Sequence, residues 1–303
     1  MNGPRQIRSI AKAPPEDRPK KSWRPKLLPH HKQSIPAGRK FFHVTRLLEE
    51  SGLSTVCQGA LCPNRAGCWS GGSLAFQILG DLCTRRCAFC GEKTGRPRPP
   101  DPSEPEKLAA MARRLGLAHV VITSPSRDDL PDHGAGQFVA CLEFLRKEIP
   151  RTTVELLVPD FQGRPDLLKS IIQMRPDIFN HNLETVRRLT PEVRARALYD
   201  RSLQILRWAA EAGLRVKSGL MVGLGETREE IRETLTDLKR NGVSLLTVGQ
   251  YLPPSPRHRP LDRLYSPEEF SSIREEAAGL FENVLAGPLV RSSYHAAEMA
   301  GAR

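Results

Sequence analysis

Short apolar runs and longer segments of helical period alternate along most of the chain after residue 73. The runs are rich in aliphatic and β-branched residues and have the length of buried strands, whereas the longer segments repeat apolar residues three and four positions apart. The pattern predicts six strands, at Leu74–Gly80, His119–Thr123, Thr153–Val158, Ile178–His181, Val216–Val222 and Ser244–Gly249. It predicts six helices, at Glu106–Leu115, Gly136–Glu148, Arg164–Met174, Arg201–Ala212, Thr227–Asn241 and Pro267–Phe281.

The order of these elements indicates a parallel sheet with helices outside it, because strands and helices alternate. Six β–α units are fewer than the eight of a closed barrel. We therefore expect a partial, open (β/α)6 TIM-type barrel, with its chemistry where the strands end. Thr227 and Glu230 predict a capping box at one helix start. Gly213 and Gly242 stand where C-terminal helix caps are expected.

The sequence predicts four segments. Residues 1–40 form a basic, proline-rich tail that we expect to be extended or disordered. Residues 41–72 form an N-terminal extension that carries three cysteines, and residues 73–282 form the barrel. Residues 283–303 form a C-terminal extension with the motif RSSY. We expect the two extensions to cover the open end of the barrel.

The positive charge is concentrated in the tail. The formal net charge is +12, and residues 1–40 hold eleven Lys or Arg and two acids, so the tail carries 11 − 2 = +9 and the rest about +3. A nucleic-acid enzyme more often carries its basic residues on the folded body, so we expect no nucleic-acid partner. The favoured interpretation of the tail is a solubilising segment. The alternative is an arm that steers an acidic protein partner or docks on the barrel.

The chain contains no run of 18 apolar residues, and no apolar segment follows its basic N-terminus. We therefore expect neither a membrane span nor a secretory signal. Clustered cysteines in a reducing cytoplasm indicate metal binding or catalysis rather than disulfides. We expect a cytoplasmic protein, and a monomer.

Six of the seven cysteines form two triplets, and the second triplet directly follows the first predicted strand. Cys83, Cys87 and Cys90 have the spacing C-x3-C-x2-C, which places them on the catalytic rim. The next residues, GEKTGRPRPP, offer neither Cys nor His, so the set lacks the fourth ligand of a structural zinc site. The favoured interpretation is a 4Fe–4S cluster with one iron open to a small molecule. A zinc ion with a distant fourth ligand is the alternative.

The first triplet, Cys57, Cys62 and Cys68, has the spacing C-x4-C-x5-C. This spacing is unusual for zinc and favours a second iron–sulfur cluster, again one ligand short. Cys141 offers another thiolate. It lies within a helical apolar pattern, however, which favours a buried small hydrophobic residue.

Two segments resemble radical S-adenosylmethionine enzymes. CTRRCAFC matches the C-x3-C-x-aromatic-C signature of that family, and Gly219–Glu226, GLMVGLGE, is similar to its fifth-strand segment that contacts adenine. The resemblance implies that the amino and carboxylate groups of S-adenosylmethionine fill the open iron position. Reduction of the cluster then yields methionine and a 5′-deoxyadenosyl radical, so the cofactor carries the difficult chemistry.

The paired blocks CQGALCPNRAGCW and ILGDLCTRRCAFC resemble the lipoyl synthases in order and spacing. The similarity continues through NHNLETVRRL, GQYLPPS and GPLVRSSYHA, and covers roughly residues 40–296. It implies that the first triplet holds an auxiliary 4Fe–4S cluster with a serine oxygen of RSSY as fourth ligand, at Ser293 or, as a fallback, at Ser292. Oxygen suits a soft cluster less well than a thiolate, so this iron is lost more easily.

The chain departs from that family beside both triplets. Acidic residues commonly follow the first cysteine in the family, whereas this chain has Gln58 and Gly59. Gly91 and Glu92 after the last cysteine of the second triplet are also unusual. All six cysteines are present, so the function implied by the resemblance is kept.

The resemblance implies a substrate and partners. The substrate is an octanoyl chain on a lysine of a lipoyl carrier protein or domain, such as an H protein or an E2 subunit, and sulfur replaces hydrogen at C6 and C8. These carbons are unactivated, so no side-chain acid or base can remove their hydrogens. The further partners implied are an electron donor such as flavodoxin or ferredoxin, and an iron–sulfur carrier that rebuilds the auxiliary cluster.

Several polar residues at strand ends and nearby are candidates to bind S-adenosylmethionine or the lysyl amide, with loop-ordering contacts as the alternative. They are Thr123, Ser124, Asn180, Asn182, Glu184, Arg201, Lys217, Gly223 and Glu226. Either Lys217 or Arg201 is expected to meet the cofactor carboxylate. His181 is interpreted as structural, and Asp128 and Asp129 as turn-forming or helix-capping residues.

Two other functions are weighed against this one. Another sulfur-inserting radical enzyme, such as a biotin synthase or a methylthiotransferase, is disfavoured by the upstream C-x4-C-x5-C together with a terminal RSSY. A zinc-stabilised nucleic-acid-binding protein would account for the sequence pI of 9.7 and the six cysteines. The location of the charge and an aromatic content of 6% argue against it.

Overall fold

The computed structural model describes residues 27–32 and 38–301. Most of the predicted tail lies outside these residues, so its extended character stays a prediction. The described part of the tail contains a short 3-10 helix, Pro29–His31, and the start of the first α-helix, α1, Arg39–Ser51.

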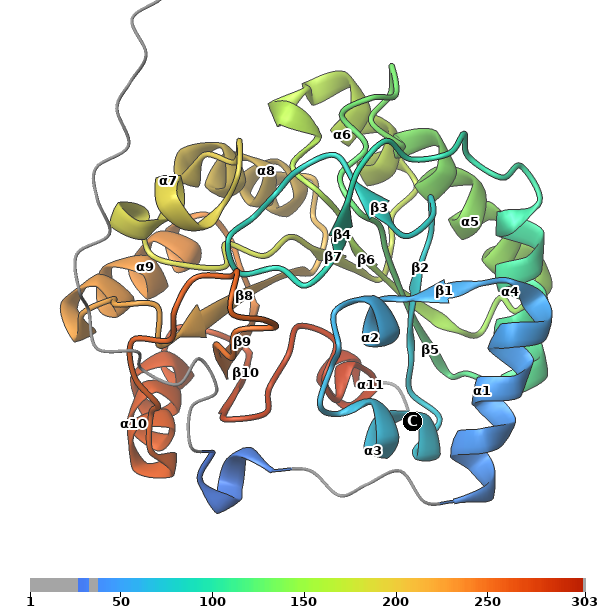
Figure 1. The fold of residues 1–303 in the computed structure, drawn as a ribbon. Helices are drawn as coiled ribbons and strands as arrows, with labels where there is room; N and C mark the ends of the chain where they lie inside the picture. The colour runs from blue at the N-terminus through green and yellow to red at the C-terminus, as the bar shows by residue number, and fades with distance from the viewer. Residues whose placement is uncertain (1–26, 33–37, 302–303) are drawn as a thin grey trace, which may run out of the picture.

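The core of the described chain is one open, mostly parallel sheet (Figure 1). Its strand order is β1-β2-β5-β6-β7-β8-β9-β10, and only β1 runs antiparallel to its neighbour. The strands are β1 Ser54–Thr55, β2 Ala75–Gln77, β5 His119–Thr123, β6 Thr153–Leu157, β7 Ile178–Asn180, β8 Val216–Val222, β9 Leu245–Gln250 and β10 Asn283–Gly287. A separate small pair, β3 Leu82–Cys83 and β4 Lys93–Thr94, follows β2. The predicted partial barrel is confirmed, because β1 and β10 remain free edges.

All six predicted helices are present, as α4 Glu104–Leu115, α5 Ala135–Glu148, α6 Pro165–Gln173, α8 Tyr199–Glu211, α9 Arg228–Arg240 and α10 Pro267–Ala278. Two of them begin at side-chain caps that the sequence provides. Thr227 and Glu230 form the predicted capping box of α9, and Ser266 forms a second one at α10. Gly213 and Gly242 adopt φ values of 76° and 79° after α8 and α9, as C-terminal caps require.

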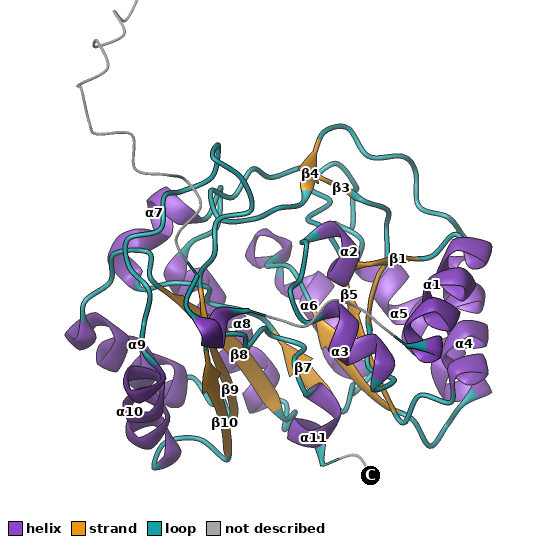
Figure 2. Cartoon of the chain, turned by 60° about the horizontal axis from the view of Figure 1, so that its bottom comes forward, coloured by secondary structure: helices purple, strands orange, loops and turns teal. Residues whose placement is uncertain are grey.

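The segments before and after the barrel lie together between the two edges of the sheet. The N-terminal segment forms α2, Val56–Gly59, and α3, Arg65–Ser70, and the C-terminal segment forms α11, Ala296–Ala300. Figures 1 and 2 show these three short helices on the inner side of the curved sheet, opposite the long helices. The Asn64 side chain donates a hydrogen bond to the Leu289 carbonyl and so joins the two segments directly. A short helix α7, Thr190–Val193, and two 3-10 turns, Phe161–Gly163 and Arg187–Leu189, complete the described elements.

Among the described helices, none combines the length and the apolar composition needed to cross a membrane. Cys141 lies on α5 and is 0% exposed. It packs in the hydrophobic core, as the sequence pattern predicts.

A charged pair is buried in the interior of the sheet. Lys217 on β8 and Glu155 on β6 are both fully buried, and the Lys217 Nζ donates to both Glu155 carboxylate oxygens at 3.0 and 2.9 Å. Asn180 also donates to Glu155, and His119 Nε2 lies 3.7 Å from it. Burial alone would raise the pKa of Glu155, but Lys217 and His119 hold that pKa below its ordinary value. The prediction that Lys217 meets a cofactor carboxylate is not supported, because its ammonium already has a buried partner.

A Lys217→Met variant is expected to lower the free energy of unfolding by about 3–5 kcal/mol, because it leaves the Glu155 charge buried without its cation. Chemical denaturation of the anaerobic apo-protein measures this loss. Lys169 on α6 is exposed, so Lys169→Met is the matched control, with an expected change within about 0.5 kcal/mol. Equal losses for the two variants would show that the buried pair contributes nothing.

Candidate active site

A cavity of about 540 Å³ opens at the carboxyl ends of the parallel strands. The ends of β5, β6, β8 and β9 and the loops that follow β2 and β7 supply most of its lining. The segment around Arg291 closes it from the C-terminal side, and the α2 segment closes it from the N-terminal side. Five of the six clustered cysteines line it, namely Cys57, Cys62, Cys83, Cys87 and Cys90. The two triplets therefore face one space, although they belong to different parts of the chain.

Backbone hydrogen bonds hold the loop of the second triplet from several sides. Thr84 N–H donates to the Ser126 carbonyl at 3.0 Å, and Ala88 N–H donates to the Val193 carbonyl at 2.9 Å. Arg259 N–H donates to the Ala88 carbonyl at 2.8 Å. The loop is thus tied to the segments that follow β5, β7 and β9.

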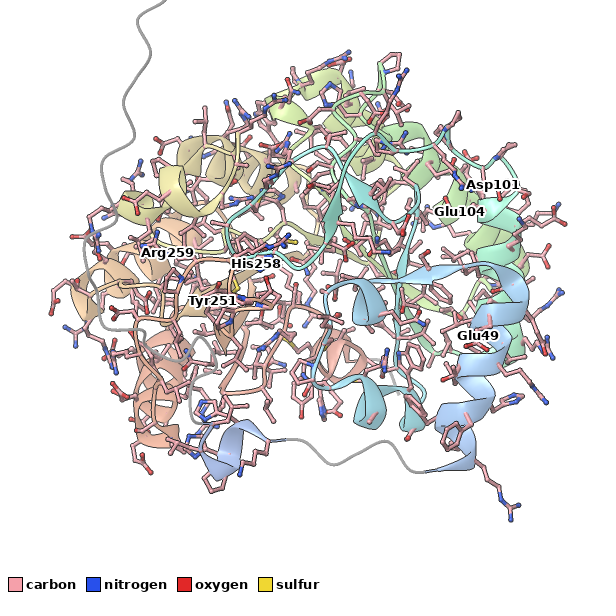
Figure 3. All side chains as sticks on the ribbon, viewed as in Figure 1. Glu49, Asp101, Glu104, Tyr251, His258 and Arg259 are labelled. Carbon is pink, nitrogen blue, oxygen red and sulfur yellow. The ribbon has the colours of Figure 1, made fainter. Side chains whose placement is uncertain are left out.

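The loop after β9 adds a side-chain contact to this support. The His258 ring, through Nε2, lies 2.9 Å from the Cys90 carbonyl, while Nδ1 pairs with the Ser255 hydroxyl. The Tyr251 hydroxyl donates to the Arg259 carbonyl and closes the loop on itself. Figure 3 shows Tyr251, His258 and Arg259 close together on this side of the cavity. Such contacts fix the backbone of a ligand residue and hence the direction of its sulfur.

Burial disfavours the charged form of the thiols in this loop. It raises the pKa of Cys90 to about 12, and the Glu92 backbone N–H offsets the shift only in part. Burial also raises the pKa of Cys87, against the opposing effects of the Ala195 backbone and the Arg194 guanidinium. A bound metal displaces the proton of a coordinating thiol. Metal binding would therefore offset the free-energy cost of burying thiolates here.

The first triplet is carried by α2, α3 and the turn between them. Cys57 lies on α2 and is buried, and Cys68 lies on α3. Burial, with Cys62 and Cys57 nearby, raises the pKa of Cys68 to about 12. The Arg291 guanidinium acts on Cys62 electrostatically and lowers that thiol's pKa, although burial has the larger, opposite effect. Arg291 thus brings a positive charge to the thiol set, where bound thiolates would be negative.

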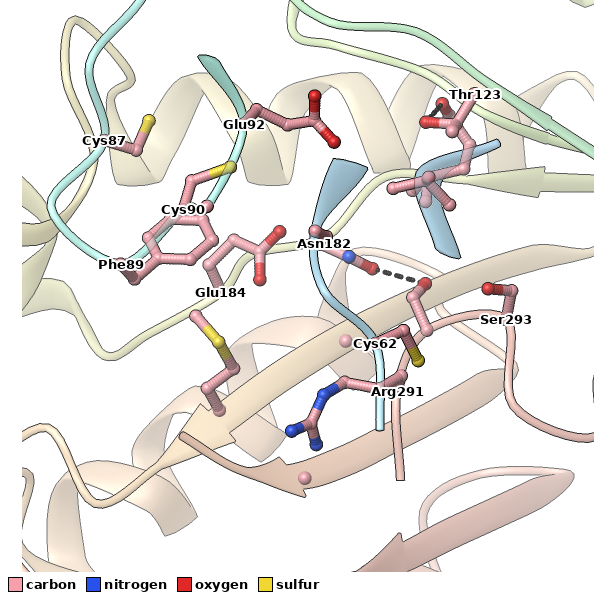
Figure 4. Close-up of a pocket in the computed structure, with 18 of the residues that line it drawn as sticks. Cys62, Cys87, Phe89, Cys90, Glu92, Thr123, Asn182, Glu184, Arg291 and Ser293 are labelled. Carbon is pink, nitrogen blue, oxygen red and sulfur yellow. Dashed lines mark hydrogen bonds between the residues drawn. The ribbon is translucent and has the colours of Figure 1, made fainter. Parts of the chain in front are cut away.

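The two serines of RSSY differ in their surroundings, and Figure 4 shows Ser293 among the residues that line the cavity. The Ser292 hydroxyl accepts from Asn180 Nδ2 at 2.9 Å and donates to Asn182 Oδ1 at 2.9 Å. Ser293 lines the same cavity, and its hydroxyl has no hydrogen-bond partner within the described chain. The hydroxyl of Ser293 is therefore available to an incoming ligand, whereas that of Ser292 is already used.

The spacing of the thiols differs from that of a site for a single ion. Among residues 27–32 and 38–301, no three His, Cys, Asp or Glu side chains lie close enough together to hold one metal ion. A structural zinc site would bring its sulfur ligands to about 2.3 Å from the ion. The six clustered cysteines, five of which line the cavity, supply three thiols for each of two multi-iron clusters and leave each cluster a place for one further ligand.

Four of the predicted cofactor residues line the cavity, namely Thr123, Ser124, Asn182 and Glu184. A fifth, Asn180, lies behind them and contacts Ser292. Burial raises the pKa of Glu184, and Arg194 opposes this shift.

The remaining candidates lie elsewhere. Arg201 borders a separate polar depression beside α8 and pairs with Asp160 at 3.2 Å. Gly223 is outside the lining too, and Glu226 accepts hydrogen bonds from the backbone N–H groups of Gly223 and Leu224. The Tyr265 hydroxyl donates to the same carboxylate. Glu226 therefore closes the turn after β8, and the structure does not support a cofactor contact for it.

Two arginines that line the cavity were not identified as candidates from the sequence. Arg85, between the first two cysteines of its triplet, pairs with Asp128 at 2.7 Å and with Asp160 at 2.6 Å. Arg194 is 8% exposed and donates to Ser202 at 2.8 Å, and it acts electrostatically on Glu184. No periodicity or motif marks either residue, because their partners come from distant loops.

Two interpretations of nearby residues are resolved by these contacts. Asp128 and Asp129 lie in a turn, as predicted, and both side chains also form ion pairs, Asp128 with Arg85 at 2.7 Å and Asp129 with Arg127 at 2.9 Å. His181 is 2% exposed and contacts the Val158 carbonyl and the Ser202 hydroxyl, as expected of a structural histidine.

Comparison with known proteins agrees with this geometry. Residues 78–238 match the radical SAM superfamily. A lipoyl synthase of Rubrobacter xylanophilus is 48% identical over 270 residues, which cover 88% of this chain and 84% of the relative. A lipoyl synthase of Parabacteroides distasonis is 46% identical over 263 residues, which cover 86% of this chain and 94% of the relative. The chain belongs to the lipoyl synthase family, within the radical SAM superfamily.

Solved structures support the fold. SuiB of Streptococcus suis, bound to S-adenosylmethionine, aligns with a TM-score of 0.54 at 15% identity, over 67% of this chain and 46% of that one. Methylornithine synthase aligns with a TM-score of 0.54 at 16% identity, over 69% of this chain and 63% of that one. At such identities the likeness concerns the partial barrel alone. Family membership implies S-adenosylmethionine and 4Fe–4S clusters as cofactors.

Proposed function

We propose that this enzyme inserts two sulfur atoms, at C6 and C8, into an octanoyl chain that is amide-linked to a lysine of a lipoyl carrier protein. The observation that carries the proposal is the convergence of two incomplete thiol triplets on one cavity, in a chain 46–48% identical to lipoyl synthases. A single triplet would account for radical formation but would leave no source of sulfur.

The residues present fit the groups that the family implies. Cys83, Cys87 and Cys90 would hold one cluster and leave its fourth position to S-adenosylmethionine. The first triplet would hold the second cluster, with Ser293 as the fourth ligand. When bound, these groups supply the radical that removes hydrogen from an unactivated carbon and the sulfur that replaces it.

The protein's own residues provide the enclosure. Leu157, Leu220, Met221 and Val290 line the cavity, so an aliphatic chain there meets apolar side chains rather than water. Exclusion of water protects a radical from side reactions. We propose that Arg194, with Asn182 and Glu184 nearby, meets the polar groups of the cofactor, Arg194 as the partner of its carboxylate.

No side-chain acid or base is needed in this scheme. The carboxylates of Asp128 and Asp160 near the cavity both pair with Arg85, and Asp160 pairs with Arg201 as well. Burial would raise the pKa of Asp160, but Arg85 holds it low, at about 2. These groups therefore remain charged structural supports, which agrees with chemistry at carbons that no base can deprotonate.

The decisive experiment is a single-turnover reaction. The protein is reconstituted anaerobically with iron and sulfide, and is then given reductant, S-adenosylmethionine and an octanoyl-lysyl peptide. Mass spectrometry is expected to find the peptide first with one sulfur and then with two, together with 5′-deoxyadenosine. Formation of 5′-deoxyadenosine without any thiolated peptide would overturn the sulfur-inserting function and leave only membership of the superfamily.

The finer assignments of partners extend this proposal. We propose octanoylated H protein or E2 domains as substrates, flavodoxin or ferredoxin as the electron donor, and an iron–sulfur carrier that rebuilds the consumed cluster. The cytoplasm, where such partners and a reducing environment occur, is the proposed location. The role of the basic tail in these encounters stays a prediction.

A further inference from the structure

Glu92 and Gly59 fit together across the two cysteine loops. Gly59 ends α2, two residues after Cys57, and Glu92 stands two residues after Cys90. A Cβ atom placed on Gly59 would lie 2.9 Å from both Cδ and Oε2 of Glu92, and closer still to Oε1. The carboxylate of one loop therefore occupies the space of a side chain on the other.

Backbone conformation does not demand glycine at position 59. Gly59 is not among the residues with positive φ, and it lies in a helical turn where any L-residue fits. The side chain of the neighbouring Gln58 has a partner elsewhere, because its oxygen accepts a hydrogen bond from Thr55 at 2.9 Å. A larger side chain at position 59 would therefore have to displace the Glu92 carboxylate, which is the flexible end of that side chain.

Glu92 is fastened on its other sides as well. Its Oε2 accepts from Gln77 Nε2 at 3.2 Å, and its backbone N–H supports the Cys90 sulfur. The preceding residue, Gly91, packs against Pro254 and the Ala60 backbone, at 3.3 and 3.8 Å from a Cβ placed on it. One carboxylate oxygen, Oε1, is buried and has no hydrogen-bond partner in the described chain.

Leaving a buried carboxylate oxygen unpaired costs stability, and an apolar side chain would fill the same space without that cost. The hydrogen bonds that Glu92 makes within the described chain therefore do not explain a carboxylate in this place. We propose that Glu92 is a positioning residue that locks the loop of Cys90 against the loop of Cys57 and so fixes the separation of the two cluster sites. This inference rests on the proposed function.

Such a lock affects the transfer of sulfur to the substrate, and not the formation of the radical. Formation of the radical depends on the loop of Cys83, Cys87 and Cys90, which is held independently by Ser126 and His258. Transfer of sulfur depends on a substrate carbon that is within reach of both sites. A displacement of about 1 Å costs about 100-fold in such a reaction.

Four variants test the lock. Glu92→Ala is expected to form 5′-deoxyadenosine within about twofold of the wild-type rate, while thiolated peptide per 5′-deoxyadenosine falls at least about tenfold. Glu92→Gln, which keeps the shape, is expected to stay within about threefold of wild type in that ratio. Gly59→Glu alone is expected to lower the ratio like Glu92→Ala, because two side chains then compete for one space. The reciprocal double variant, Gly59→Glu with Glu92→Ala, is expected to recover it.

A second measurement does not depend on substrate or product. Pulsed electron paramagnetic resonance of the reduced, reconstituted protein reports the magnetic interaction between the two clusters. The strength of that magnetic interaction is expected to decrease, or its distribution to broaden, in Glu92→Ala. The reciprocal double variant is expected to recover the wild-type value. A wild-type protein that forms no thiolated peptide would defeat the proposed function, but this measurement would still decide whether Glu92 is the lock.

Three results would overturn the inference. One is an unchanged product ratio and an unchanged cluster interaction in Glu92→Ala. Another is a Glu92→Gln variant as impaired as Glu92→Ala, which would assign the effect to charge rather than fit. The third is a reciprocal double variant whose losses equal the product of the two single losses, because independent effects add in free energy.

Discussion

Cys87→Ala is expected to abolish the cleavage of S-adenosylmethionine, whereas Cys62→Ala is expected to retain cleavage and lose sulfur insertion. Cys87 belongs to the triplet on the barrel rim, and Cys62 to the triplet carried by the α2–α3 segment. With two thiolates instead of three, neither set can hold its cluster firmly. The two losses differ because only the rim cluster meets the cofactor.

Anaerobic turnover with quantification of 5′-deoxyadenosine and of thiolated peptide separates the two outcomes. Iron and sulfide analysis is expected to show about half of the wild-type content in each variant, because one of two clusters is lost. Cys141→Ala is the matched control, since Cys141 is a core residue on α5 and lines no part of the cavity. It is expected to keep both activities. A Cys62→Ala protein that still transfers two sulfur atoms would exclude the first triplet as the sulfur source.

The arrangement of the barrel could be predicted because each of its elements carries its own local signal. The six expected strands and helices are all present, and the capping box at Thr227 occurs as expected. The edge strand β10 was not predicted. It pairs with β9 in parallel, although its sequence, NVLAG, is short and only half-buried. Such a strand is defined by its neighbour in the sheet rather than by periodicity.

The cysteine ligands could be predicted from the sequence, whereas the charged residues that support the site could not. The cysteines could be found because their spacing is a local property of the chain. Lys217 is an expected cofactor contact, but in the structure its ammonium pairs with Glu155, 62 residues away and two strands along the sheet, and the strand patterns do not show which buried side chains pair in this way. Arg194 was missed for the converse reason, since the loop after β7 brings it to the cavity without a motif. The order of these strands could be predicted, but the pairing of individual charged side chains across the sheet and its loops could not.

The serine ligand is nominated by the resemblance to lipoyl synthases, and the structure places this serine at the cavity. Composition gives no reason to nominate a serine more than two hundred residues from Cys68. The fold brings the C-terminal segment against the N-terminal one through Asn64 and Leu289, which puts both serines at the cavity. The contacts of Ser292 with Asn180 and Asn182 favour Ser293 as the ligand.

Ser293→Ala is therefore expected to lower sulfur insertion at least about 100-fold, the upper part of the range for disturbed metal sites. Cleavage of S-adenosylmethionine is expected to stay within about threefold of wild type, because the rim cluster is untouched. Mössbauer spectra of the reconstituted variant are expected to lose the distinct signal of an oxygen-ligated iron. Ser293→Cys is expected to keep the auxiliary cluster but to release its sulfur more slowly, because thiolate is the softer and better ligand.

Ser292→Ala is the matched control, since it removes the same hydroxyl one residue away. It frees Asn180 and Asn182 from a shared partner, so a smaller loss of both cleavage and sulfur insertion is expected. The reverse result, with Ser292→Ala losing only sulfur insertion and Ser293→Ala unaffected, would move the ligand to Ser292. In that case the hydrogen bonds to the two asparagines would have to break when the cluster binds. Binding of the cluster would then change the contacts of Asn180 and Asn182 at the end of β7. A ligand at Ser293 leaves the hydrogen bonds of Ser292 to these two residues intact.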